Sequence, residues 1–240
     1  MSNYISSERL VTTIQKIAKR EGVNITDQQI LDEVFTKKQN KLSKKADNQT
    51  FLYVDGTNLL AGLIELFDPD EIPSFNSILK DINKLFKISR TYFYASYTTV
   101  IKKKFKRNVE IEAKFYKEVK DTPNLIFYKG YRSPTSGKEK GVDVHLAIDL
   151  VKGAFQKSYK QAVIITGDAD LTYAVEAARG EDLPIHAVFL PNRFSRGIAH
   201  AANSSVVINY KGFFVPAKKH KLPQNLKVVK IKTPARVRTG

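Results

Sequence analysis

The chain of 240 residues contains no cysteine, which excludes disulfide bonds and thiolate metal sites. Its four histidines, His145, His186, His200 and His220, are scattered and form no metal-ligand motif. No run approaches the roughly 18 apolar residues of a membrane-spanning helix. The first residues also lack the basic start and the apolar stretch of a signal peptide. We therefore expect a soluble, cytoplasmic protein that does not associate with membranes.

Acidic residues are missing from the C-terminal part of the chain. Residues 209–240 contain nine Lys or Arg side chains and no Asp or Glu, whereas the whole chain contains 40 and 24. Such a segment could follow the phosphate backbone of a nucleic acid. Alternatively, it is a solvated basic tail without a partner. A nucleic-acid partner is thus one of two explanations for much of the net charge of +16.

Residues 1–47 are predicted to form a helical extension followed by a linker. Apolar residues recur at helical spacing over residues 6–21. Thr26 has the form of a capping-box residue that opens a second helix. Two helices are too few to bury a core of their own. We therefore expect them to contact the main domain, a partner protein or another copy of the chain.

Residues 48–210 alternate short β-branched or aromatic runs with helical patterns. This alternation predicts an α/β domain with a parallel sheet and right-handed crossovers. Beyond it, residues 211–240 are predicted to form a basic tail that contains one β-prone stretch at residues 226–231.

Four aspartates lie at the ends of predicted strands or at the start of a predicted helix. Asp55 follows a short apolar run, and Asp168 and Asp170 follow the β-branched run at residues 162–166. Asp143 lies in the first turn of the helix that leads into that same run. Because parallel strands end at one edge of a sheet, where the antiparallel helices begin, we expect the four carboxylates to converge there.

A cluster of carboxylates resists ionisation unless a cation lies between them. Oxygen ligands without Cys or clustered His favour Mg²⁺ or Mn²⁺ over Zn²⁺. Such a site could activate water and stabilise the leaving oxygen in phosphodiester hydrolysis, with Asn58 orienting a ligand. Each aspartate alone has a structural explanation, as a turn residue at Asp55, a helix cap at Asp168 or Asp170, or a partner of the helix dipole at Asp143. Their joint occurrence favours the metal site.

Basic side chains elsewhere are candidates for contacts with nucleic-acid phosphates. Aromatic residues beside them, as in residues 128–132, could stack unpaired bases. A solvated helix face and ordinary core packing are the alternatives. The candidate contacts are Lys103, Lys104, Lys106, Arg107, Arg132, Lys140, Arg193, Arg196, Lys218 and Lys219.

Three segments together resemble the motifs of the NYN domain, in the LabA-like branch of the PIN-like ribonucleases. They are Val54–Asn58, Lys140–Asp149 and Thr166–Leu171, and the resemblance covers about residues 50–208. It implies a PIN-like three-layer α/β/α sandwich with a central, mostly parallel sheet. It also implies metal-dependent ribonuclease activity at an acidic site with Asn58 beside it. The acids would be Asp55, Asp143, Asp168 and Asp170.

Asn203 and Asp149 lie within or near these motifs but are not among the predicted acids of the site. The family often has Ala-Asp before its last strand, but this chain has Ala202 and Asn203, which supply no charge. Asp149 lies six residues after Asp143 on a different face of the predicted helix, and we expect it to be structural.

The leading hypothesis is a Mg²⁺- or Mn²⁺-dependent endoribonuclease that acts on single-stranded or structured RNA, with DNA still open as a substrate. RNA processing, a toxin or a defence effector would all use the same site. The alternative is a nucleic-acid-binding or scaffold protein without turnover. A haloacid-dehalogenase-like phosphatase is disfavoured, because its nucleophilic aspartate would fall at Tyr53.

Overall fold

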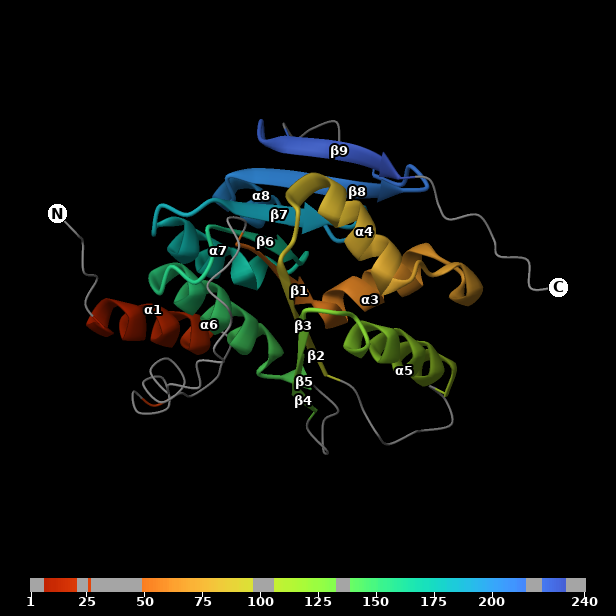
Figure 1. The fold of residues 1–240 in the computed structure, drawn as a ribbon, viewed down its shortest axis with the longest axis horizontal. Helices are drawn as coiled ribbons and strands as arrows, with labels where there is room; N and C mark the ends of the chain where they lie inside the picture. The colour runs from red at the N-terminus through yellow and green to blue at the C-terminus, as the bar shows by residue number, and fades with distance from the viewer. Residues whose placement is uncertain are drawn as a thin grey trace.

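A seven-stranded sheet forms the centre of the protein (Figure 1). The computed structural model describes residues 7–20, 26, 49–96, 106–132, 139–214 and 222–231. In sequence order the strands are β1 (Thr50–Asp55), β2 (Arg90–Ala95), β3 (Leu125–Lys129), β6 (Gln161–Ile165), β7 (Ile185–Phe189), β8 (Ser204–Tyr210) and β9 (Leu226–Ile231). Their order across the sheet is β3-β2-β1-β6-β7-β8-β9, and every neighbouring pair is parallel.

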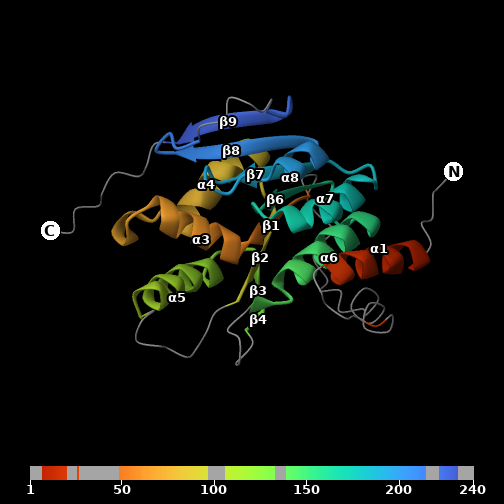
Figure 2. The same cartoon turned by 180° about the vertical axis from the view of Figure 1, so that it is seen from behind.

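Helices cover both faces of this sheet, as the two opposite views show (Figures 1 and 2). One face carries α3 (Gly56–Leu66), α4 (Phe75–Phe86) and α5 (Lys106–Lys120), and the other carries α6 (Val142–Phe155), α7 (Thr172–Arg179) and α8 (Arg196–Ala201). Short 3-10 turns lie at η1 (Pro69–Glu71) and η3 (Ala169–Leu171), and β4 (Tyr131–Arg132) pairs antiparallel with β5 (Glu139–Lys140). The prediction of a three-layer α/β/α sandwich is confirmed.

The central strand β1 shows why both faces must be covered. All six of its residues are buried. Because successive side chains of a strand point to opposite faces, Phe51 and Tyr53 pack in the core beneath α6 and α7. Leu52 and Val54 pack in the second core, beneath α3 and α4. An apolar run of this kind is typical of a strand buried on both sides.

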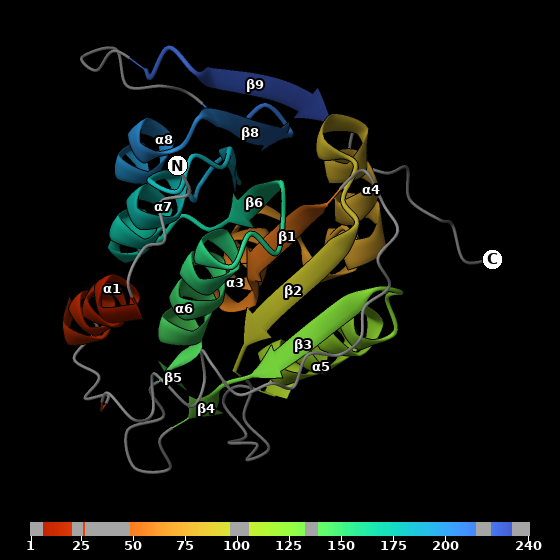
Figure 3. The same ribbon diagram turned by 60° about the vertical axis from the view of Figure 1, so that its left-hand side comes forward.

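Helix α1 (Ser7–Arg20) packs on the main domain against α6 (Figure 3). Its Ile14 and Ile17 are buried in the same core cluster as α6. Among the three contacts that we considered for this extension, the main domain is the one observed. The second helix that we predicted to open at Thr26 lies outside the described residues. No helix in the described ranges is long and apolar enough to cross a membrane.

The sheet continues beyond residue 210, where the sequence pattern placed the end of the domain. Strand β9 pairs with β8 in parallel register from Ser205↔Leu226 to Tyr210↔Ile231. The β-prone stretch that we predicted within the basic tail, residues 226–231, is therefore a strand of the main sheet, and the tail assignment does not hold for it. Strand β9 lies at the edge of the sheet, and its exposed Lys227 and Lys230 suit an edge without a further partner strand.

The imidazole of His186 on β7 predicts a specific dependence of stability on pH. Burial lowers the pKa of His186, whose Nδ1 lies 2.7 Å from the Ser204 hydroxyl and whose ring lies 5.2 Å from that of Phe86. Below the ordinary value of about 6.5, the unfolded chain therefore binds this proton more readily than the folded chain. The contribution of the neutral His186 side chain to the free energy of unfolding is therefore intact above about pH 6.5. It is lost as the pH falls from there through the lowered pKa.

We expect the free energy of unfolding of the His186→Gln variant to fall less steeply between pH 7 and pH 5 than that of the wild type. Urea denaturation at several pH values measures both slopes, and the difference between them cancels the titration of all other groups. Equal slopes would contradict the assignment.

Candidate functional site

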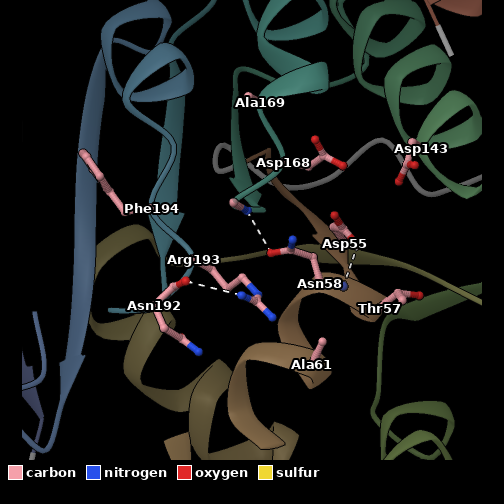
Figure 4. Close-up of a pocket in the computed structure, with 11 residues that line it drawn as sticks. Asp55, Thr57, Asn58, Ala61, Asp143, Asp168, Ala169, Asn192, Arg193 and Phe194 are labelled. Atoms are coloured by element: carbon pink, nitrogen blue, oxygen red, sulfur yellow. Dashed lines mark hydrogen bonds between the residues drawn. The ribbon is translucent and has the colours of Figure 1, made fainter. Parts of the chain in front are cut away.

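A cavity of about 550 Å³ opens at the carboxyl edge of the sheet (Figure 4). The strand order reverses between the neighbours β1 and β6, and ligands of open α/β sheets bind outside the strand ends at such a switch point. The lining combines acidic, amide and basic groups from four separate segments. It consists of Asp55, Thr57, Asn58, Ala61, Asp143, Gly167, Asp168, Ala169, Asn192, Arg193 and Phe194.

Asp55 ends β1 and caps α3. Its backbone is extended, and its Oδ1 accepts a hydrogen bond from the Asn58 N–H at 2.9 Å. Its Oδ2 accepts from the Thr166 hydroxyl at 2.8 Å. The residue is only 3% exposed, so these two donors take the place of the water molecules that a carboxylate loses when it is buried. The turn and cap roles are thus real, and the same carboxylate also lines the cavity.

Asn58 and Thr166 tie the end of β1 to the loop after β6. The Asn58 Oδ1 accepts from the Gly167 N–H at 2.9 Å, and the Thr166 Oγ1 accepts from the Asp168 N–H at 3.0 Å. Thr166 thus contacts both Asp55 and the backbone of Asp168. This network fixes the two loops that carry carboxylates at the switch point.

Asp143 enters the cavity from the first turn of α6. The cap of this helix is Gly141, whose φ of 81° lies in the left-handed region that favours glycine. A residue with a side chain would be strained there, so Gly141 fixes where the helix begins. In Figure 4 the carboxylates of Asp55, Asp143 and Asp168 face a shared space between α6, β1 and the loop after β6.

The structure separates the two acids of the loop after β6. Asp168 lines the cavity and caps η3, with its Oδ1 accepting from the Asp170 N–H at 3.0 Å. Asp170 is exposed and does not line the cavity. Three of the four predicted acids therefore meet at one place, and the fourth lies outside it.

Asp149 has the structural role that its helix face indicated. The Tyr94 hydroxyl donates to its Oδ2 at 2.7 Å. Burial, together with the charge of Asp149, raises the pKa of Tyr94 well above its ordinary value, so the phenol stays a proton donor. The bond fixes α6 to β2.

The donor set of the cavity fits a hard divalent cation. No group of three His, Asp or Glu side chains in the described part of the chain is arranged to hold a metal by itself. Mg²⁺ rarely needs such a cage, because it keeps several waters and binds through one or two carboxylates together with substrate phosphates. The cavity offers carboxylates of this kind at Asp55, Asp143 and Asp168.

The wall beside Asn58 contains Arg193, which is one of the predicted phosphate contacts, together with residues that the sequence patterns did not single out. Asn192 and Arg193 follow β7, and both interact with Glu65 of α3. Phe194 packs against Phe189 and Phe214. Because β7 ends at the same edge as β1 and β6, its position could have drawn attention to Asn192. Thr57, one residue before Asn58, is a further cavity residue that was missed.

Of the predicted phosphate contacts, Arg193 alone lines the cavity among the described side chains. Arg196 is exposed on α8, where its Nε lies 3.4 Å from His200 Nε2. The structure describes only the backbone of four others: Lys106 and Arg107 at the start of α5, Arg132 in β4 and Lys140 in β5. The remaining four, Lys103, Lys104, Lys218 and Lys219, lie outside the described residues.

Comparison with known proteins matches the NYN domain to residues 49–209. The chain belongs to the NYN domain family. This range contains every residue that lines the cavity, and NYN is a PIN-like nuclease domain. Membership of the LabA-like branch stays a prediction.

Two further comparisons add little to the NYN assignment. A solved structure of a protein of unknown function from Vibrio parahaemolyticus is similar over 68% of this chain and 96% of its own, with 15% identity and a TM-score of 0.45. None of the curated proteins matches the sequence.

Proposed function

We propose that this NYN protein is a Mg²⁺- or Mn²⁺-dependent endoribonuclease. The observation that supports this most strongly is the meeting of Asp55, Asp143 and Asp168 around one open cavity at the switch point of the sheet. The three carboxylates come from separate crossover units, so local turn and cap roles do not explain why they share a cavity. The family assignment supplies the reaction class, and the metal and the RNA substrate are our proposal.

Each side chain has a defined part in this proposal. Asp55, which accepts hydrogen bonds from Asn58 and Thr166, would hold the cation with Asp143 and Asp168, directly or through waters that the cation keeps. A bound cation would polarise the phosphate and lower the pKa of an attacking water. Asn58 holds the loop of Asp168 in register through the Gly167 N–H. These contacts preorganise the acids before substrate arrives, which spares the site reorganisation during the reaction.

The proposal predicts cleavage at internal bonds of RNA and dependence on a divalent cation. We would incubate the protein with closed circular RNA, linear RNA and DNA of the same sequence, each with Mg²⁺, Mn²⁺ or EDTA. We expect circular RNA to be opened with Mg²⁺ or Mn²⁺ and to stay intact with EDTA. Cutting of linear RNA only from its ends would contradict the endonuclease assignment, and cutting of DNA alone would contradict the choice of RNA.

The alternative is a nucleic-acid-binding or scaffold protein without turnover, which the net charge of +16 also suits. Its signature would be RNA that stays intact with every metal although the protein binds it in a salt-sensitive manner. A cytoplasmic location, an association through the N-terminal residues, and a role in RNA processing, as a toxin or as a defence effector stay predictions.

A further inference from the structure

Arg193 is the positively charged side chain among those that line the cavity, which also presents three carboxylates. It lies on the wall next to Asn58 and Ala61, away from Asp143 (Figure 4). A guanidinium cannot bind the cation that the carboxylates would hold, because the two charges repel. It does match a phosphate, to which arginine donates two parallel hydrogen bonds.

The position of Arg193 is fixed by close backbone contacts. A Cβ on Gly167 would lie 2.6 Å from the Arg193 carbonyl oxygen, so the loop before Asp168 packs directly on the backbone of Arg193. A Cβ on Gly62 would lie 2.8 Å from the Arg193 Cγ, so the side-chain stem rests on α3. The backbone and the side-chain stem of Arg193 are therefore held in a fixed position relative to the loop that carries Asp168.

Glu65 restrains the guanidinium of Arg193 at the rim of the cavity. It forms an ion pair with Arg193 and accepts from the Asn192 Nδ2 at 2.9 Å. The side chains of Arg193 and Glu65 are 28% and 53% exposed, which makes the pair weak enough to be exchanged. A guanidinium has five N–H donors, and its bonds to Glu65 and to the Asn192 carbonyl use two of them.

We propose that Arg193 forms a second phosphate subsite, which binds the phosphate adjacent to the one that is cleaved. The inference rests on the proposed function in that the ligand is an RNA strand. A strand that lies across the cavity would place one phosphate at the carboxylates and its neighbour at Arg193. Glu65 would then compete with that second phosphate for the guanidinium. The substrate must consequently extend beyond a single phosphodiester.

Binding in EDTA tests the subsite independently of cleavage. With a fluorescent single-stranded oligoribonucleotide, the Arg193→Gln variant should bind about tenfold more weakly, since hydrogen bonds to charged groups are the strong ones. Its plot of log affinity against log salt should be shallower by about 0.7, the loss of one phosphate contact on a single strand. Fluorescence anisotropy at several salt concentrations measures both quantities.

The Glu65→Gln variant separates this subsite from a merely structural ion pair. Removal of the competitor should tighten RNA binding a few-fold, opposite in direction to Arg193→Gln. A structural pair would make both variants less stable and change binding in the same direction. The pair Lys84 and Asp81 on α4, 2.7 Å apart, gives matched controls in Lys84→Gln and Asp81→Asn, because that end of α4 leads to the opposite edge of the sheet. Weaker binding in both Glu65→Gln and Arg193→Gln, or no change in either, would overturn the subsite.

Cleavage assays distinguish failure of this inference from failure of the proposed function. For an oligoribonucleotide, Arg193→Gln should raise KM about tenfold, whereas the loss of kcat/KM for a ribodinucleotide with one phosphodiester should be several-fold smaller. An equal loss on both substrates would overturn the second subsite. If the wild type cleaves no RNA, the proposed function fails, and the binding data still decide whether Arg193 holds a phosphate.

Discussion

The Asp55→Asn variant is expected to lose RNA cleavage by about a thousandfold while it keeps its fold. The side chain is buried, lines the cavity and would supply one of the anionic oxygens to the cation. Lewis-acid stabilisation of a phosphoryl oxygen contributes several kcal/mol, and each 1.36 kcal/mol changes a rate tenfold. Loss of the charge at this position should therefore remove most of the rate enhancement.

The fold should survive because asparagine reproduces both structural bonds of Asp55. Asn and Asp are equally good helix caps, so the amide oxygen can accept from the Asn58 N–H in place of Oδ1. The amide nitrogen would face the Thr166 hydroxyl, which already accepts from the Asp168 N–H and has a second lone pair to accept with. The variant thus keeps a hydrogen bond between residue 55 and Thr166, with the direction of donation reversed.

Thermal unfolding with and without metal checks this expectation without reference to activity. A ligand at 100 times its Kd stabilises the folded state by about 2.7 kcal/mol. The wild type should therefore melt at a higher temperature when Mg²⁺ or Mn²⁺ is added, and Asp55→Asn should not respond. The exposed Asp70, which does not line the cavity, supplies the matched control Asp70→Asn, which should respond like the wild type. Full cleavage by Asp55→Asn would rule out the carboxylate as a metal ligand.

The parts of the fold that the sequence predicts are those with strong local patterns. The predicted helix with Asp143 in its first turn is observed as Val142–Phe155, because an apolar face and Gly141 define it locally. The convergence of Asp55, Asp143 and Asp168 was predictable because parallel strands share one carboxyl edge. That rule needs only the order of strands and helices, which the hydrophobic periodicity provides.

The parts of the fold that the sequence does not predict depend on contacts between distant residues. Glu65 and Arg193 lie 128 positions apart, and neither has a local motif that indicates a partner. The antiparallel pairing of Tyr131 with Lys140 is likewise set by register. Strand β9 was recognisable as β-prone, but its place in the sheet depends on its pairing with β8. Tertiary hydrogen bonds override weak local preference in each case.

Substitution of the two neighbouring acids after β6 is expected to give opposite results. Asp168→Asn should reduce cleavage as strongly as Asp55→Asn, because Asp168 lines the cavity with Asp55 and Asp143. Asp170→Asn should stay within about threefold of the wild type, since an exposed charge outside the cavity is screened by solvent and salt. The two variants change the same group two positions apart, so each is the matched control of the other.

Both variants are expected to fold because of the way in which η3 begins. Asp168 caps this turn by accepting from the Asp170 N–H, and asparagine can accept the same bond, so both variants should fold. Single-turnover cleavage of one labelled RNA with Mg²⁺ and with Mn²⁺ would measure both rates. If Asp170→Asn lost as much activity as Asp168→Asn, the site would need its fourth acid, and the loop after β6 would have to move when metal and RNA bind. If neither variant lost activity, the acidic site would not be the site of cleavage.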